Sequence, residues 1–106
     1  MFARRVSMHL KPNSVADFTK TLDKEIIPLL RRQTGFQDEI TFVVPGKMEA
    51  FGISLWDKAE NAEAYNSGSY SETLRILARV VEGTPRVETY EVANSTFHKI
   101  PVAVTV

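Results

Sequence analysis

The alternation of apolar and polar positions predicts four β-strands. Side chains alternate with a period of two in residues 3–11, 36–44, 48–56 and 86–92, which places successive residues on opposite faces of a strand. In the first strand one face is apolar and we expect it to meet helices, whereas the other carries polar side chains; the two sets are Val6, Met8 and Leu10, and Arg5, Ser7 and His9. In the third strand Gly52, Ser54 and Trp56 share a face.

The second and third strands form a predicted hairpin. Between them lies Val44-Pro45-Gly46-Lys47, and a Pro-Gly pair suits the two central positions of a type II turn. The strand before the turn and the strand after it are therefore expected to run antiparallel.

A first helix is predicted between the first two strands. Apolar residues recur at helical spacing after Ser14, which with Asp17 forms a candidate capping box; they are Val15, Phe18, Leu22, Ile26, Leu29 and Leu30. Pro28 lacks an N–H and clashes with the preceding turn, so we expect a kink or a restart near Ile27.

A second helix in two pieces follows the third strand. The candidate N-cap of the first piece is Asp57, with Glu60 three residues later, and that of the second is Ser69, with Glu72. The break between the pieces is Ser67-Gly68-Ser69. The second piece has an apolar stripe formed by Tyr70, Leu74, Leu77, Ala78 and Val81, widened by Ile76 and Val80. Residues 82–85 contain Gly and Pro and indicate a stop before the last strand.

The resulting order βαββαβ is typical of the ferredoxin-like fold. We predict an α+β domain with a four-stranded antiparallel sheet, both helices on one face, and the first and third strands in the centre, where we expect these two to be parallel. The bare opposite face favours closure against a second copy. We assign residues 1–96 to this domain and 97–106, where Ile100, Val102, Val104 and Val106 alternate, to a short C-terminal strand or arm.

Composition restricts the classes of partner. The 106 residues suit one domain, and 13 basic and 13 acidic side chains cancel, so nothing favours nucleic acid or an anionic membrane. There is no apolar leader and no window near the ~20 apolar residues of a membrane span, which predicts a soluble, cytoplasmic protein. With two histidines and no cysteine, we expect no metal site.

Three stretches of the chain resemble a known family. LKPN, IIPLLRRQTGF, and ISLWDKAENAEAY followed by Ser-Gly-Ser are similar to the dimeric α+β barrel group that includes the antibiotic biosynthesis monooxygenase-like (ABM) domains, over residues 3 to about 95. The resemblance implies this fold and a homodimer. The group's activities differ: it contains cofactor-free oxygenases, haem-degrading oxygenases and proteins of unassigned role.

The residues at the family's haem positions argue against haem degradation. The resemblance places Tyr65 where those enzymes have a helix tryptophan and Arg75 where they have the iron-ligating histidine, and arginine does not ligate iron. Residues 1–12 also lack the family's asparagine. We therefore expect no cofactor.

The cofactor-free oxygenases imply a different site. In them the substrate, a small aromatic or quinol, supplies the electrons for oxygen, while the protein orients it and handles protons. The resemblance makes Trp56 a candidate catalytic residue, whose indole N–H would hold a substrate oxygen, and Arg75 a candidate for an anionic substrate. The asparagine that accompanies this tryptophan in the family is missing. Candidate substrate-binding residues are Val6, Met8, Phe18, Tyr65 and Tyr70.

Alternatives to an enzyme stay open at this stage. A non-catalytic ligand-binding or stress-associated dimer would have the same pocket, and a purely structural dimer would fill it with side chains; Trp56 as a core aromatic and Arg75 as a solvated side chain fit that case. A pocket of roughly 300 Å³ or more separates the first two from the third. Whether Glu39, Glu49 or Glu91 faces the pocket depends on strand register.

Overall fold

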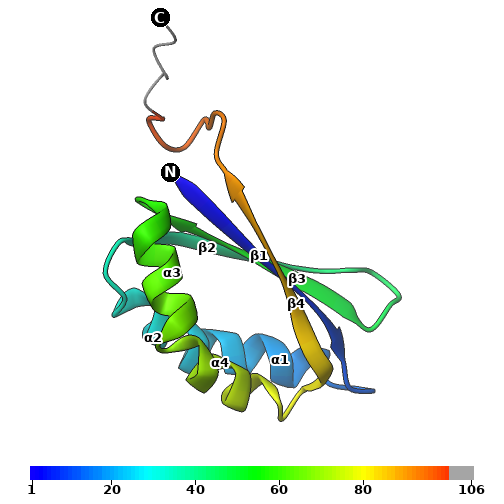
Figure 1. The fold of residues 1–106 in the computed structure, drawn as a ribbon. Coiled ribbons are helices and arrows are strands. Elements are labelled where there is room, and N and C mark those ends of the chain that lie inside the picture. Colours follow the sequence, from blue (N-terminus) through cyan, green and yellow to red (C-terminus); the bar gives the residue numbers. More distant parts are fainter. Residues whose placement is uncertain (101–106) are drawn as a thin grey trace, which may run out of the picture.

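The computed structural model describes residues 1–100, which form a four-stranded antiparallel sheet covered by helices on one face (Figure 1). The strands are β1 (Phe2–Leu10), β2 (Phe36–Val43), β3 (Glu49–Trp56) and β4 (Val81–Glu91). The helical elements are α1 (Val15–Thr21), the π-helical segment η1 (Leu22–Ile26), α2 (Ile27–Arg31), α3 (Ala59–Ser67) and α4 (Tyr70–Leu77). The predicted ferredoxin-like α+β fold is confirmed.

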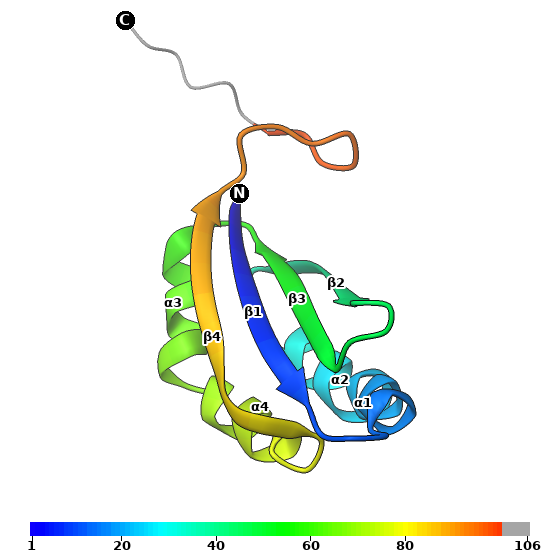
Figure 2. The same ribbon diagram turned by 90° about the vertical axis from the view of Figure 1, so that its right-hand side faces the viewer.

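The sheet has the strand order β2-β3-β1-β4 (Figure 2). As predicted, β1 and β3 are central, but they run antiparallel, with Phe2 opposite Trp56 and His9 opposite Glu49. The expected parallel pair is therefore wrong. The helical connection brings β2 back in the direction of β1, and the tight hairpin then reverses β3.

The hairpin turn has the predicted type II geometry. Gly46 has a φ of +73°, and the Lys47 N–H donates to the Val44 carbonyl at 3.2 Å. In β2 the pairing with β3 shifts by one residue between Phe36 and Asp38. This irregularity puts Phe36 on the same, helix-facing side of the sheet as the odd-numbered residues that follow it.

The first helical region changes its hydrogen bonding in the middle. The π-helical turn η1 directly precedes α2, whose first turn contains Pro28, so the predicted interruption near Ile27 is confirmed. Ser14 takes the N-cap position, but its hydroxyl donates to the Pro12 carbonyl at 3.4 Å and makes no cap hydrogen bond. The expected capping box is therefore absent from α1.

The second helical region breaks at Gly68, as predicted. Ser69 takes the N-cap position of α4, but its side chain makes no cap hydrogen bond. The N-cap of α3 is Lys58, so the prediction of Asp57 is wrong. The Asp57 N–H donates to the Gly35 carbonyl at 2.9 Å, and its carboxylate accepts from Asn61 Nδ2 at 2.8 Å. These contacts hold Asp57 in the connection, and the helix begins two residues later.

The last strand begins five residues earlier than predicted. Val81, expected on the helix stripe, is the first residue of β4, and residues 82–85 continue the strand instead of ending the helix. Gly83 has a φ of +68°, and the pairing with β1 is irregular between Ser7 and His9, which accommodates the Gly-Thr-Pro sequence.

The core fills the space between the sheet and the helices, and its largest fully buried side chains are Leu10, Phe18 and Trp56. None of the helices within residues 1–100 has the length and apolar character needed to cross a bilayer. After β4, residues 92–100 contain no helix or strand. Of the predicted C-terminal strand, residues 101–106 lie outside the described part, so the assignment of 97–106 to an arm stays a prediction.

Candidate functional site

A small cavity lies between the sheet and the helices, and we call it the inner cavity. Its volume is about 50 Å³, and its walls come from β1, η1, α2, β2, β3, α3 and α4. This volume exceeds that of a single water molecule but is well below the roughly 300 Å³ expected of a small-molecule pocket, so in this conformation the space is close to the filled core of the purely structural alternative. The polar groups in its walls distinguish it from an ordinary gap in an apolar core.

Arg4, on β1, brings a buried positive charge to the inner cavity. Its side chain is 2% exposed, and its Nη2 donates to Asn66 Oδ1 at 2.7 Å. The guanidinium carbon lies 4.0 Å from the ring centre of Tyr70 and 5.1 Å from that of Tyr65. No carboxylate within residues 1–100 forms an ion pair with Arg4. Aromatic faces and an amide offset part of its desolvation, but no counter-charge does.

The two tyrosines beside Arg4 differ in their hydrogen bonding. The hydroxyl of Tyr65, on α3, shares a hydrogen bond of 2.7 Å with Thr73 Oγ1 on α4. Tyr70 is 8% exposed, and its buried O–H finds no acceptor in the described chain, although the Arg4 guanidinium approaches the phenol oxygen as a donor. Burial raises the pKa of both phenols. The hydrogen bond with Thr73 and then the charge of Arg4 oppose the rise at Tyr65, and the charge and hydrogen bonding of Arg4 oppose it at Tyr70, in each case only in part. Both phenols are therefore neutral, and that of Tyr70 has a free donor.

Glu39 reaches the inner cavity from β2. Burial raises the pKa of its carboxyl group, and the hydrogen bond from the Thr41 hydroxyl acts in the opposite direction. Gly52 on the neighbouring strand leaves room for these side chains, since a Cβ there would lie 3.2 Å from Glu39 Oε1 and from Thr41 Oγ1. A carboxyl group with a raised pKa in a cavity is suited to accept a proton from a bound acid.

The strand register of the structure shows which of the three glutamates considered in the sequence analysis faces the inner cavity. Glu39 lines the inner cavity. Glu49 lies opposite His9 in the register of β3 and β1, on the face of the sheet without helices. Glu91 is exposed at the end of β4.

Trp56 contacts two residues that line the inner cavity but does not line it itself. It is fully buried, its Nε1 donates to Ser54 Oγ at 2.9 Å, and its ring stacks on Tyr65 with 5.2 Å between the centres. Its indole N–H is therefore already bonded, and its side chain does not line the inner cavity. Phe18, another candidate, is also fully buried without lining it.

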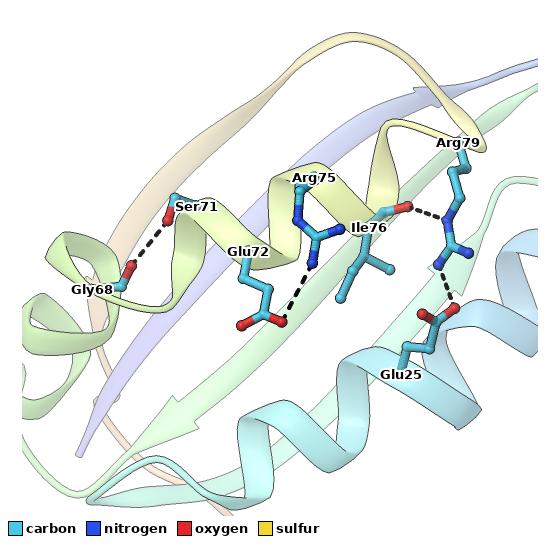
Figure 3. A network of polar contacts seen from close by, with 7 residues as sticks. All are labelled: Glu25, Gly68, Ser71, Glu72, Arg75, Ile76 and Arg79. Carbon is cyan, nitrogen blue, oxygen red and sulfur yellow. Dashed lines mark hydrogen bonds and ion pairs between the residues drawn. The ribbon is translucent and has the colours of Figure 1, made fainter.

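Four of the seven candidate residues line the inner cavity: Val6, Met8, Tyr65 and Tyr70. Arg75 does not. Its side chain is 73% exposed and pairs with Glu72 at 3.5 Å on the surface of α4. Figure 3 shows this pair and, just after the end of α4, the ion pair of Arg79 with Glu25 of η1. Its suggested catalytic role stays a prediction.

Sequence analysis missed the polar residues of the inner cavity, namely Arg4, Thr41, Ser54 and Thr73. A signal for Arg4 was present, because it lies two residues before Val6 and a strand repeats its faces every two residues. Thr73 also lies four residues before the predicted core residue Leu77. Among residues 1–100, no three histidine, aspartate or glutamate side chains gather closely enough to hold a metal ion.

No protein-family model matches the sequence, and no curated protein matches it. Solved structures do. SnoaB, a cofactor-independent oxygenase from Streptomyces nogalater, has a TM-score of 0.73 at 11% identity, over 90% of this chain and 95% of that one. A monooxygenase from the gene ActVA-Orf6 of Streptomyces coelicolor, in complex with the ligand nanaomycin D, has a TM-score of 0.74 at 12% identity, over 92% of each chain.

A third similar structure is from Bordetella bronchiseptica and is named after the antibiotic biosynthesis monooxygenases. Its TM-score is 0.73 at 16% identity, over 88% of this chain and 97% of that one. Identities this low carry information about the fold alone. The chain therefore has the fold of the antibiotic biosynthesis monooxygenase-like domains, as its resemblance to them predicted.

Proposed function

We propose that this protein is a cofactor-independent monooxygenase of a small aromatic or quinol substrate, which binds in the inner cavity. The observation that carries the proposal is the cavity itself, because it combines a buried cation, an unbonded phenol and a carboxyl group with a raised pKa. Most buried polar groups of a core that serves only structure are hydrogen-bonded. The proteins of this fold named as oxygenases support the same function.

The proposed reaction balances without another reductant. A quinol and O₂ give a hydroxylated quinone and water: one oxygen atom replaces a ring hydrogen, and the other leaves as water. The substrate loses four electrons and O₂ accepts four. In this scheme Glu39 accepts the proton of a substrate hydroxyl, and Val6, Met8, Tyr65 and Tyr70 hold the ring.

Binding of such a ring requires the inner cavity to widen, because about 50 Å³ holds no aromatic ring. We propose that η1 moves, since it supplies Leu22 and Ile26 to the wall and has π-helical hydrogen bonding in place of the α-helical pattern. Such segments are often found at functional sites.

Oxygen uptake with a panel of quinols tests the proposal. We expect Glu39→Gln to lower the rate by about 100-fold, the usual contribution of a general base, and the matched variant Glu49→Gln on the other face of the sheet to leave it unchanged. Trp56→Phe tests whether the buried indole contributes to turnover beyond stability. Absence of uptake with every quinol, with only stability altered in Trp56→Phe, would reject the enzyme and leave a ligand-binding protein.

We further propose that two chains form a homodimer through the face of the sheet that the helices leave bare. Large apolar side chains are exposed on two of its strands, among them Ile40, Phe42 and Tyr90. A second copy would remove them from water, as the resemblance to dimeric α+β barrels implies.

A further inference from the structure

The inner cavity has a positive charge with which no carboxylate of the described chain forms an ion pair. The titratable side chains that face it are Arg4 from β1, Glu39 from β2, Tyr65 from α3 and Tyr70 from α4, while η1 and α2 contribute aliphatic side chains. Arginine keeps its charge in proteins, and neither phenol supplies a negative one. Glu39 is hydrogen-bonded to Thr41 and forms no ion pair with Arg4.

The hydroxyl of Tyr70 adds a donor beside this charge. Tyr70 packs directly under the Arg4 guanidinium, and both side chains line the same cavity. A buried O–H without an acceptor is uncommon, because the loss of its hydrogen bond to water is not recovered. An oxygen anion would satisfy both groups at once, since it accepts hydrogen bonds from a guanidinium and from a phenol.

We propose that Arg4 and Tyr70 bind the deprotonated oxygen of an acidic phenol or enol, so that the substrate occupies the inner cavity as its anion. The identity of the substrate rests on the proposed function, whereas binding of the anion does not require turnover. The preference for an anion also suits the chemistry, because a phenolate gives up an electron to O₂ more readily than a neutral phenol does.

Binding of 4-nitrophenol provides a direct test, because its anion absorbs visible light and its neutral form does not. The wild-type protein is titrated into the ligand below the ligand's own pKa, and Kd is measured separately by equilibrium dialysis. We expect binding to lower the ligand's pKa by at least about one unit, the usual effect of an opposite charge at close range. The ligand 4-nitroanisole, which has no ionisable hydroxyl, should bind more weakly.

Tyr70→Phe is the most informative variant, since it removes only the hydroxyl. Because the O–H of Tyr70 finds no acceptor in the described chain, its removal should leave Tm unchanged or raise it. We expect Kd for the anion to rise about 10-fold or more, which is the loss of one hydrogen bond to a charged group.

Arg4→Met has a closely matched control in Arg5→Met. The two arginines are adjacent on β1, but Arg5 faces the opposite side of the sheet, where its guanidinium carbon lies 4.5 Å from the ring centre of Phe51. We expect Arg4→Met to weaken binding of the anion by about 100-fold and Arg5→Met to change it less than about twofold. Circular dichroism establishes that each variant is folded, and Tyr70→Phe carries the test if Arg4→Met is not.

The outcomes separate this proposal from the proposed function. Anion binding that depends on Tyr70, without oxygen uptake, would support the binding site and reject the monooxygenase. Oxygen uptake that Tyr70→Phe and Arg4→Met leave unchanged would support the monooxygenase and overturn the anion site. Binding of 4-nitrophenol in its neutral form, or no binding at millimolar concentration, would also overturn the anion site.

Discussion

Glu39 is a residue of the inner cavity whose burial lowers the stability of the fold at neutral pH and at the same time suits it to act as a base. Burial raises its pKa above the ordinary value of 4.5, so the folded protein holds a proton there more readily than the unfolded chain does. Stability is consequently present below the unfolded pKa and is lost as the pH rises through the folded pKa. A residue that weakens the fold at neutral pH is retained more easily when it serves a function.

The loss of stability with rising pH leads to a prediction for Glu39→Gln. The amide keeps an acceptor for the Thr41 hydroxyl but does not ionise. We expect the variant to gain stability relative to the wild type as the pH rises from about 4 to about 8, and to lose that advantage at the acid end. Urea denaturation at several pH values measures the difference in the free energy of unfolding between the variant and the wild type. The contributions of the other carboxyl groups are the same in both proteins and cancel in this difference. A constant difference across this range would contradict the raised pKa.

Sequence patterns placed apolar residues of the inner cavity more successfully than polar ones. Val6 and Met8 follow the period of a strand, and burial of apolar side chains is the expectation for such a pattern. Arg4 has the same period, but a charged side chain at the end of a strand is usually solvated. Glu39 depends on the extra residue between Phe36 and Asp38, and alternation alone does not show an insertion.

At the scale of elements, Gly35 joins the two connections that flank the hairpin strands. Its φ is +81°, and its carbonyl accepts the Asp57 N–H at 2.9 Å, which links the end of α2 to the start of α3. A Cβ on Gly35 would lie 2.3 Å from Asp57 Oδ1 and 2.7 Å from Asn61 Cβ. Both the backbone conformation and the packing therefore require glycine here.

Comparison of Gly35→Ala with Gly46→Ala separates these two requirements. Gly46 also has a positive φ, but no atom lies within 4 Å of a Cβ built on it. We expect Gly46→Ala to lower the free energy of unfolding by about 1 kcal/mol and Gly35→Ala by about 2–4 kcal/mol, because the second adds a steric clash. Urea denaturation measures both, and equal losses would show that the connection tolerates the methyl group.

The order of elements follows from local patterns, whereas their ends depend on contacts between distant residues. Pro45-Gly46 determines the turn by itself, and the prediction was correct. Asp57 is an intrinsically good N-cap, yet its N–H bonds to Gly35 and the helix begins later. Likewise, Val81 fits a helical stripe, but pairing opposite Leu10 draws it into β4. Such tertiary contacts are not visible in local sequence.

The whole molecule has two unlike layers (Figure 1). Helices cover one face of the sheet and line the inner cavity, whereas the other face is open and carries Arg5, His9 and several large apolar side chains. Of these, Ile40 is 55% exposed and Phe42 is 42% exposed, and Phe42 stacks on Phe51 with 4.9 Å between ring centres. Exposed large apolar side chains on the uncovered face of a sheet are typical of an interface.

If this open face forms the proposed homodimer, a charge among its exposed apolar side chains should separate the two chains. We expect the wild type to elute with twice the chain mass of 11.9 kDa in size-exclusion chromatography with light scattering, and Phe42→Asp to elute as a single chain. Burial of an unpaired carboxylate between two apolar surfaces would weaken association by about 100-fold or more. Lys20→Glu, a charge change on the exposed surface of α1, should leave the dimer intact. A monomeric wild type would contradict the interface, and the apolar face would then need another partner.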